Sequence, residues 1–236
     1  MDQALRTRLD KLAADCAATL GSRLRGVIVY GDAVWAAAAP TTVALLVDAV
    51  TMTLVRDVTA VAARWRRAFP PPLVLDDEYL ATSCDVFPLE LLALRDTHEV
   101  VAGDASRLEG LVLDLEHLRL EVEEQLKGKI LHLRQAFIEA RGRTRLLTQL
   151  LQDSSTGFET VMRGLLYLDG REHPRKPDEV LRAVQEATGV SLPAFERIQS
   201  ARMHGGLRAA EADGLFERYH DELVELARAA DRVTRG

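Results

Sequence analysis

The 236-residue sequence predicts an α+β fold, in which a small domain with a mixed sheet is followed by an all-α helical bundle. Three observations support this prediction. Short apolar runs alternate with helical patterns over residues 1–112, helical periodicity alone fills residues 113–236, and aromatic residues make up only 5% of the chain. Because a composition rich in aliphatic and poor in aromatic residues favours packed helices over a β-sandwich, we expect two domains with these boundaries.

The N-terminal domain begins with an amphipathic helix that we expect to end near Gly21. Its apolar residues recur at helical spacing, at Leu5, Leu9, Leu12 and Cys16. The apolar run at 27–30 then predicts a buried strand that stops at Gly31. A second run, at 43–47, is apolar throughout and predicts a strand that is buried on both faces. The small residues at 33–40 predict a loop or a short helix.

Five further elements are expected in the N-terminal domain. The prolines at 70–72 end a helix, because proline cannot continue one. Acidic residues at 76–78 suit the first turn of a short helix. Pro88 interrupts a strand pattern and therefore places that strand at an edge or a bulge. In order, we expect a helix at 50–69, a strand at 73–75, a helix at 76–83, a strand at 85–92 and a strand at 98–103.

A long amphipathic helix opens the C-terminal domain. One of its faces is lined by apolar residues at helical spacing: Leu115, Leu118, Val122, Leu126, Ile130, Leu133 and Phe137. At 1.5 Å per residue this helix would be roughly 40 Å long. Breaks at 170–177 and 205–206 separate the shorter helices that follow. These are expected at 143–152, 156–168, 177–188, 193–203 and 209–232.

Two short stretches of the N-terminal domain resemble a known family. Residues 26–33 read GVIVYGDA and residues 41–47 read TTVALLV. In this order, after a first helix and before a helical bundle, they resemble the nucleotidyltransferase superfamily of DNA polymerase beta and the kanamycin and minimal nucleotidyltransferases. The resemblance implies a nucleotidyltransferase core over residues 1–112 and a nucleotide as the ligand. In active members it further implies magnesium-dependent nucleotidyl transfer.

The sequence departs from the family's pattern at the metal-binding positions. Active members carry Asp-x-Asp on the second strand, because two carboxylates at i and i+2 point to the same face and can hold magnesium. Here the matching positions are Thr42 and Ala44. Asp32 stands where the family has a serine that contacts phosphate, and its carboxylate would repel a triphosphate. We therefore expect no metal site and no cofactor, and a protein that has lost transfer activity and acts as a nucleotide- or protein-binding module.

An active enzyme with relocated carboxylates remains the alternative. Asp48 has the same strand parity as Thr42 and Ala44, Asp32 lies in the adjacent turn, and Asp85 could supply the third carboxylate. These three acids are the catalytic candidates, and magnesium is expected only if they converge. The competing interpretation is that they are solvated acids at strand ends.

The candidate ligand-binding residues surround the turn that follows the first strand. They are Gly31, Asp32, Trp35 and Thr42. The ring of Trp35 could stack on a base, although packing within the core or a lid is the simpler interpretation. A component of a toxin–antitoxin pair is a further alternative. Its basis is the Arg-x6-His spacing of Arg197 and His204, which is similar to the motif of the helical HEPN ribonucleases.

Composition limits the partners and the compartment. A net charge of −6 and a pI near 5.6 argue against binding to nucleic acid through phosphate neutralisation. The N-terminus enters an amphipathic pattern directly, and no apolar run is long enough to span a bilayer, so we expect a cytoplasmic protein without a membrane partner. Cys16 and Cys84 are expected to be free thiols. A protein partner or a homodimer remains open.

Overall fold

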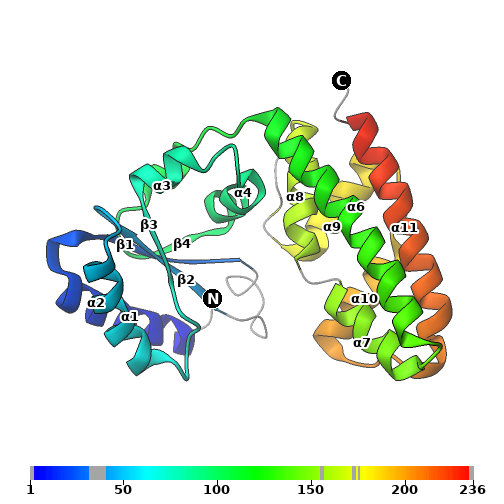
Figure 1. Ribbon diagram of the computed structural model, residues 1–236, viewed down its shortest axis with the longest axis horizontal. Coiled ribbons are helices and arrows are strands. Elements are labelled where there is room, and N and C mark those ends of the chain that lie inside the picture. Colours follow the sequence, from blue (N-terminus) through cyan, green and yellow to red (C-terminus); the bar gives the residue numbers. More distant parts are fainter. Residues whose placement is uncertain (1–2, 32–40, 155–156, 172–173, 175, 234–236) are drawn as a thin grey trace. The chain divides into compact units, whose positions relative to one another are not determined.

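The computed structural model describes residues 3–31, 41–154, 157–171, 174 and 176–233. The chain divides into two compact units, Met1–Asp114 and Leu115–Gly236 (Figure 1). The first contains a four-stranded mixed sheet with helices, and the second is built from helices, which confirms the predicted α+β class. Across the described residues, every helix is too short or too polar to cross a membrane.

The N-terminal unit contains four strands among short helices. One helix precedes the central strand pair β1–β2 and one follows it. Two more lie in sequence between β3 and β4, and a short one follows β4. In chain order the elements are α1 (Gln3–Leu20), a 3-10 turn (Gly21–Arg23), β1 (Leu24–Tyr30), β2 (Thr42–Val47), α2 (Met52–Trp65), β3 (Leu73–Asp76), α3 (Asp77–Thr82), α4 (Pro88–Thr97), β4 (Glu99–Gly103) and α5 (Ser106–Glu109).

The strands form a sheet in the order β3-β2-β1-β4. β1 pairs antiparallel with β2 and with β4, whereas β3 runs parallel to β2. The β1–β2 register places Tyr30 opposite Thr42 and Ile28 opposite Ala44. The carboxyl end of β1 therefore lies beside the amino end of β2.

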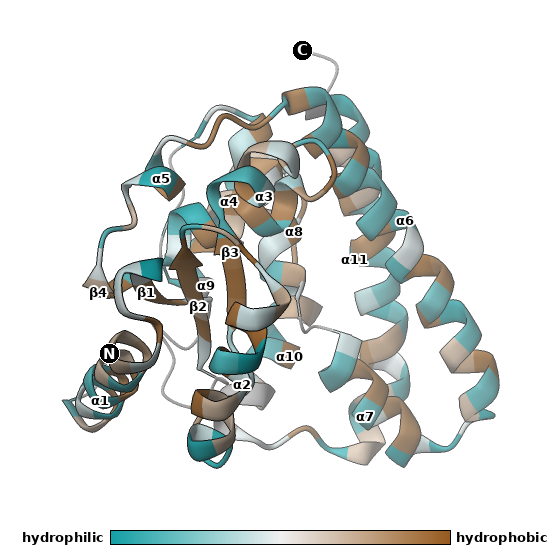
Figure 2. Cartoon of the chain, turned by 60° about the vertical axis from the view of Figure 1, so that its left-hand side comes forward, coloured by the Kyte–Doolittle hydropathy of each residue, from teal (hydrophilic) through white to brown (hydrophobic). Residues whose placement is uncertain are grey.

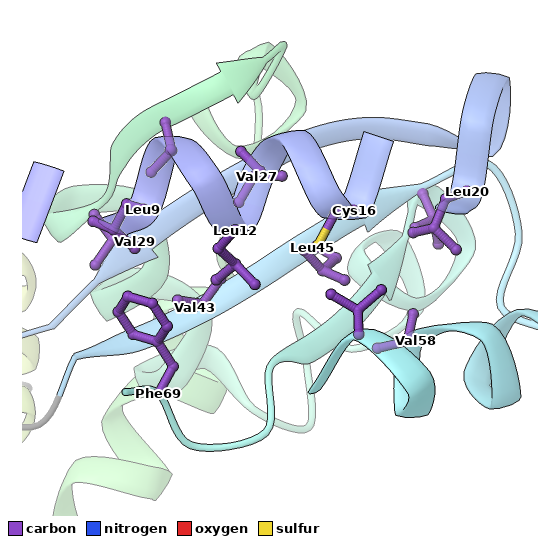
Figure 3. Close-up of a cluster of buried hydrophobic side chains, with 14 of the residues drawn as sticks. Leu9, Leu12, Cys16, Leu20, Val27, Val29, Val43, Leu45, Val58 and Phe69 are labelled. Carbon is purple, nitrogen blue, oxygen red and sulfur yellow. The ribbon is translucent and has the colours of Figure 1, made fainter. Parts of the chain in front are cut away.

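A hydrophobic core fills the space between the sheet and the first two helices (Figure 3). The central strands β1 and β2 contribute alternate residues to it, because successive side chains of a strand point to opposite faces. The α1 residues of the core recur every three or four positions, as one face of a helix requires. The core consists of Leu9, Leu12, Ala13, Cys16, Leu20, Val27, Val29, Val43, Leu45, Val47, Leu54, Val58, Val61, Phe69 and Val101.

The strand predicted at 85–92 is wrong, since this segment leads into the helix α4. Pro88 occupies the first turn of α4, where its missing N–H is unused and its fixed φ suits a helix. The apolar residues that resembled a strand are instead buried around the circumference of a helix, at Leu89, Leu91, Leu92 and Leu94. α4 contacts β1, and Figure 1 shows it on the side of the sheet away from α1 and α2.

The neighbouring strands β1 and β4 approach each other closely at a pair of glycines. Gly103 has a φ of +76°, and a Cβ atom added there would lie 2.1 Å from the carbonyl oxygen of Arg25. A Cβ on Gly26, its partner in the ladder, would lie 2.4 Å from the carbonyl oxygen of Asp104. Backbone atoms on both sides leave no room for a side chain, so this crossing requires glycine.

Gly103→Ala should therefore destabilise the protein by roughly 2–5 kcal/mol, through backbone strain at positive φ and through overlap with the Arg25 carbonyl. Urea unfolding of the two proteins measures the difference. Gly128→Ala is the matched control, because no atom lies within 4 Å of the added Cβ in the middle of α6 (Leu115–Ala140). The control should stabilise by about 0.5–1 kcal/mol. Equal stability of the two variants would contradict the account of the crossing.

The C-terminal unit is an assembly of helices built around α6. Contacts join α6 to α7, α8 and α11, and α11 in turn contacts α10. Aromatic rings form much of the centre: Phe137 stacks on Phe216 at 4.7 Å, and Phe195 lies 4.5 Å from Phe158 and 4.6 Å from Tyr219 between ring centroids. The elements are α6 (Leu115–Ala140), α7 (Thr144–Ser154), α8 (Phe158–Leu168), α9 (Pro177–Thr188), α10 (Pro193–His204), a 3-10 turn (Ala209–Glu211) and α11 (Ala212–Val233).

A buried carboxylate on α11 caps the amino end of α10. Glu222 is only 7% exposed, and its two carboxylate oxygens accept hydrogen bonds from the backbone N–H groups of Ala194 at 2.7 Å and Phe195 at 3.1 Å. These N–H groups lie in the first turn of α10, where they lack partners within the helix. Burial raises the pKa of Glu222, and the two N–H donors oppose the rise only in part.

This raised pKa makes the stability of the helical unit depend on pH. Because the folded state binds the proton of Glu222 more tightly than the unfolded state, its contribution is complete below the unfolded pKa and declines as pH rises through the folded pKa. In Glu222→Gln this dependence should be absent. Thermal unfolding between pH 4 and 7 should therefore show the wild type losing stability relative to the variant as pH rises. Glu225→Gln, an exposed change on the same helix, should follow the wild type throughout.

Candidate functional site

The candidate site lies where β1 ends and β2 begins. Tyr30 and Thr42 are paired across the two strands, and both side chains are partly buried. Gly31 follows Tyr30 with a φ of +79°, a conformation that glycine adopts at little energetic cost. Asp32 and Trp35, the other two predicted ligand-binding residues, lie outside the described residues. Of the predicted set, the structure therefore brings Gly31 and Thr42 together.

Thr42 and Ala44 lie on the same face of β2. The alternate residues Val43, Leu45 and Val47 belong to the core beneath the sheet, so Thr42 and Ala44 point to the opposite face. This is the face on which a carboxylate pair would gather a metal. The residues present here are a hydroxyl and a methyl group, neither of which supplies the anionic oxygen that magnesium prefers.

The second of these two positions is closed to solvent. Ala44 is 0% exposed, as is Ile28 on the neighbouring strand, and Leu46 is 6% exposed. The three side chains belong to one face of the β1–β2 pair, the face that α4 contacts. Thr42 remains partly exposed at the end of the strand. The site that a ligand could reach is thus limited to the strand ends around Tyr30, Gly31 and Thr42.

Thr97, the last residue of α4, also belongs to this site. Its hydroxyl accepts a hydrogen bond of 3.0 Å from the backbone N–H of Gly31 and donates one of 2.6 Å to the carbonyl of Ala93. The backbone donor at the end of β1 is therefore engaged by the protein itself. Thr97 is 4% exposed, so this contact is shielded from water.

The chemistry at the strand ends is that of neutral hydroxyl groups. Burial raises the pKa of Tyr30, which keeps its phenol protonated at neutral pH. The side chains of Tyr30 and Thr42 can donate and accept hydrogen bonds without carrying charge, whereas the hydroxyl of Thr97 is already engaged by Gly31 and Ala93. Among the residues that the structure describes here, this pair suits the polar groups of a base or a sugar and carries no charge that would hold a bare metal ion.

The structure separates Asp48 from this end of the sheet. Asp48 follows the far end of β2, where its backbone N–H donates to the carbonyl of Arg23 and its carboxylate pairs with Arg25. Six residues of extended strand place it about 20 Å from Thr42. Asp85 is an exposed residue of the turn between α3 and α4. The proposed grouping with Asp32 therefore has no support from the positions of these two acids.

A cleft of about 190 Å³ lies near Asp48, at the far end of β2, and its charged side chains have hydrogen-bond or ion-pair partners within the protein. Arg107 contacts Asp77 at 3.2 Å, and Asp76 accepts hydrogen bonds from the backbone of Val50 and Tyr79. Within the part of the chain that the structure describes, histidines, cysteines and acids nowhere form a group of three that could hold a metal. The cleft is lined by Arg25, Leu46, Val47, Leu75, Asp76, Asp77, Leu80, Asp104 and Arg107.

Neither cysteine is a candidate nucleophile, because both are held as thiols. Burial is the main cause that raises the pKa of Cys16, to about 11, and the neighbouring Asp15 adds to the rise. Burial also raises the pKa of Cys84, whose Sγ–H donates to the carbonyl of Leu80. Both cysteines are free, as the sequence predicts. Since the thiolate is the reactive form, these shifts favour a structural role.

The Arg-x6-His spacing in α10 has a structural explanation for its arginine. The guanidinium of Arg197 pairs with Glu211 at 2.5 Å and donates to the carbonyl of Gly206 at 2.7 Å. It therefore connects α10 to the segment that follows this helix. The side chain of His204 lies outside the described residues.

Comparison with solved structures identifies the fold. The chain is similar to a crystal structure of a spectinomycin adenyltransferase from Enterococcus faecialis with ATP and spectinomycin, with a TM-score of 0.51 and 10% sequence identity. The match covers 95% of this chain and 99% of the adenyltransferase. The fold is that of a nucleotidyltransferase. No protein-family model and no curated protein sequence matches the chain.

Within the nucleotidyltransferase fold, the structure adds two residues to those expected from sequence. Tyr30 could have been found, because an antiparallel pairing of the two predicted strands brings it opposite Thr42. Thr97 could not, because its contact with Gly31 spans 66 residues and depends on α4, which the sequence pattern did not predict.

Introducing a carboxylate pair by Thr42→Asp and Ala44→Asp should not create a metal site. A carboxylate at Ala44 would be buried without a partner, which destabilises by about 3–5 kcal/mol. Thr42→Asp alone, at the partly exposed strand end, should lower the melting temperature much less. Thermal unfolding of the three variants with and without magnesium tests this. A stabilisation by magnesium that appears only in the double variant would contradict the conclusion that Ala44 is closed off.

Proposed function

We propose that this protein is a nucleotidyltransferase-fold module that binds a nucleotide without metal-dependent transfer. The observation that supports the proposal is the residue pair on β2: by the resemblance of the sequence, Thr42 and Ala44 match the positions where active members carry their metal-binding carboxylates, and Ala44 is fully buried. Phosphoryl chemistry of this class needs metal ions to neutralise the transferred group and to activate the attacking hydroxyl. With those ligands replaced, binding is the function that the remaining groups support.

The nucleotide would bind at the end of β1 and the start of β2. Gly31, Asp32, Trp35 and Thr42 are the proposed ligand-binding residues, and Tyr30 would add a neutral phenol. The similarity of the fold to that of an adenyltransferase seen with ATP supports this choice of ligand class. Hydroxyl groups that recognise a base or ribose need no metal, so we expect affinity that is independent of magnesium.

Isothermal titration with ATP and with adenosine, each in magnesium and in EDTA, tests the proposal. The expected result is binding that is equal in the two conditions, without release of pyrophosphate when candidate acceptors are added. Thr42→Val should weaken binding about three- to tenfold, the loss of one hydrogen bond. Thr53→Val, an exposed change on α2, is the matched control and should bind as the wild type does.

Two results would overturn the proposal in different ways. Pyrophosphate release that requires magnesium and fails in Asp32→Asn would establish an active enzyme. The absence of any binding at millimolar nucleotide would rule out a nucleotide as the ligand and would not affect the fold. The remaining hypothesis would then be a module that binds a protein partner.

A further inference from the structure

A row of large aliphatic side chains is exposed on α6. Leu120, Leu131 and Ile138 have 49%, 60% and 73% of their surface in contact with solvent. The buried face of the same helix contains Leu118, Val122, Leu126, Ile130 and Leu133. At 100° per residue the three exposed side chains fall within about 20° of one another, on the side of the helix opposite the bundle core. Figure 2 shows hydrophobic and hydrophilic stretches alternating along α6.

Charged residues complete this row at regular intervals. Glu124, Lys127 and Arg134 lie between the aliphatic residues, so that the steps along the helix are four, three, four, three and four residues. This alternation of three and four is the spacing of the seam of a coiled coil, where one helix packs along another. We call this set, Leu120, Glu124, Lys127, Leu131, Arg134 and Ile138, the α6 seam.

The α6 seam is complementary to itself when a second copy runs in the opposite direction. With the twofold axis at position 129, Leu120 meets Ile138, Glu124 meets Arg134 and Lys127 meets Leu131, and each pair occurs twice. The outer layers are then aliphatic, and the next layers join opposite charges. We propose that two copies of this chain associate through antiparallel pairing of their α6 seams. The interface is isologous, as a symmetric dimer requires.

The side chains between the outer layers are compatible with this arrangement. The ammonium of Lys127 forms ion pairs with Glu123 at 3.0 Å and Asp231 at 3.5 Å. Its methylene stem can therefore pack on Leu131 of the second copy. Arg134 donates from Nε to Nε2 of His220 at 3.1 Å, and its terminal nitrogens can still reach a carboxylate on the second copy.

The charge pattern also selects the direction of pairing. In a parallel arrangement each residue of the seam meets its own copy, so that Glu124, Lys127 and Arg134 would each face a like charge. Like charges held opposite each other at an interface destabilise it. The antiparallel arrangement replaces these three repulsions with two ion pairs and two layers of lysine stem on leucine. A second copy is therefore the occupant that the sequence of the seam fits.

A charge exchange in the full-length protein tests the proposal. Sedimentation velocity from 1 to 100 µM should show the wild type associating to a dimer. Glu124→Arg and Arg134→Glu should each weaken the dimer at least about tenfold, because each places like charges opposite one another twice. The double variant Glu124→Arg/Arg134→Glu should restore the wild-type dissociation constant. Glu139→Arg makes the same charge change off the seam and should leave association unchanged.

Ile138→Asp probes the aliphatic layers and should make the protein monomeric over the same range. Circular dichroism confirms that the variants remain folded, which is expected because every altered side chain is exposed. A wild type that is monomeric at 100 µM would overturn the proposal that two copies associate through the α6 seam. A dimer that persists in Ile138→Asp, or one that the double exchange fails to restore, would place the interface on a different surface.

Discussion

The antiparallel pairing of β1 with β2 is the constraint on which the rest of the N-terminal unit depends. It fixes which residues face the core and which face the opposite side, because a slip of one residue would exchange the two sets. It also fixes which ends of the strands are neighbours. Tyr30, Gly31 and Thr42 meet because of this register, and Asp48 is carried to the far end of the sheet for the same reason.

The same pairing separates the residues of β2 that pack in the core from those on the opposite face. The core beneath the sheet uses Val43, Leu45 and Val47, and Thr42 and Ala44 alternate with them on the other face. Two neutral residues at positions 42 and 44 leave that core untouched and place no neighbouring anions on one face of the strand.

Sequence reasoning succeeded where a signal is local and failed where it is not. The strands at 27–30 and 43–47 were predicted because continuous apolar runs bounded by glycine or polar residues specify buried strands. The apolar pattern does not predict α4, because Pro88 interrupts a strand pattern, whereas proline is favoured in the first turn of a helix. The distance between Asp48 and the turn at Gly31 depends on strand direction, which the apolar pattern does not contain. The sequence alone does not distinguish the exposed aliphatic residues of α6 from those in the bundle core, because both are apolar and recur at helical spacing; their exposure in the structure does.

The hydrogen bond from Gly31 to Thr97 has a consequence for any molecule that occupies the strand ends. An occupant that needs the Gly31 amide must compete with a hydroxyl already in place, and displacing that hydroxyl frees the last turn of α4 from β1. Entry of a ligand and loosening of a helix end would then be one event. Hydrogen–deuterium exchange of the Gly31 amide would therefore report both ligand entry and the loosening of the last turn of α4.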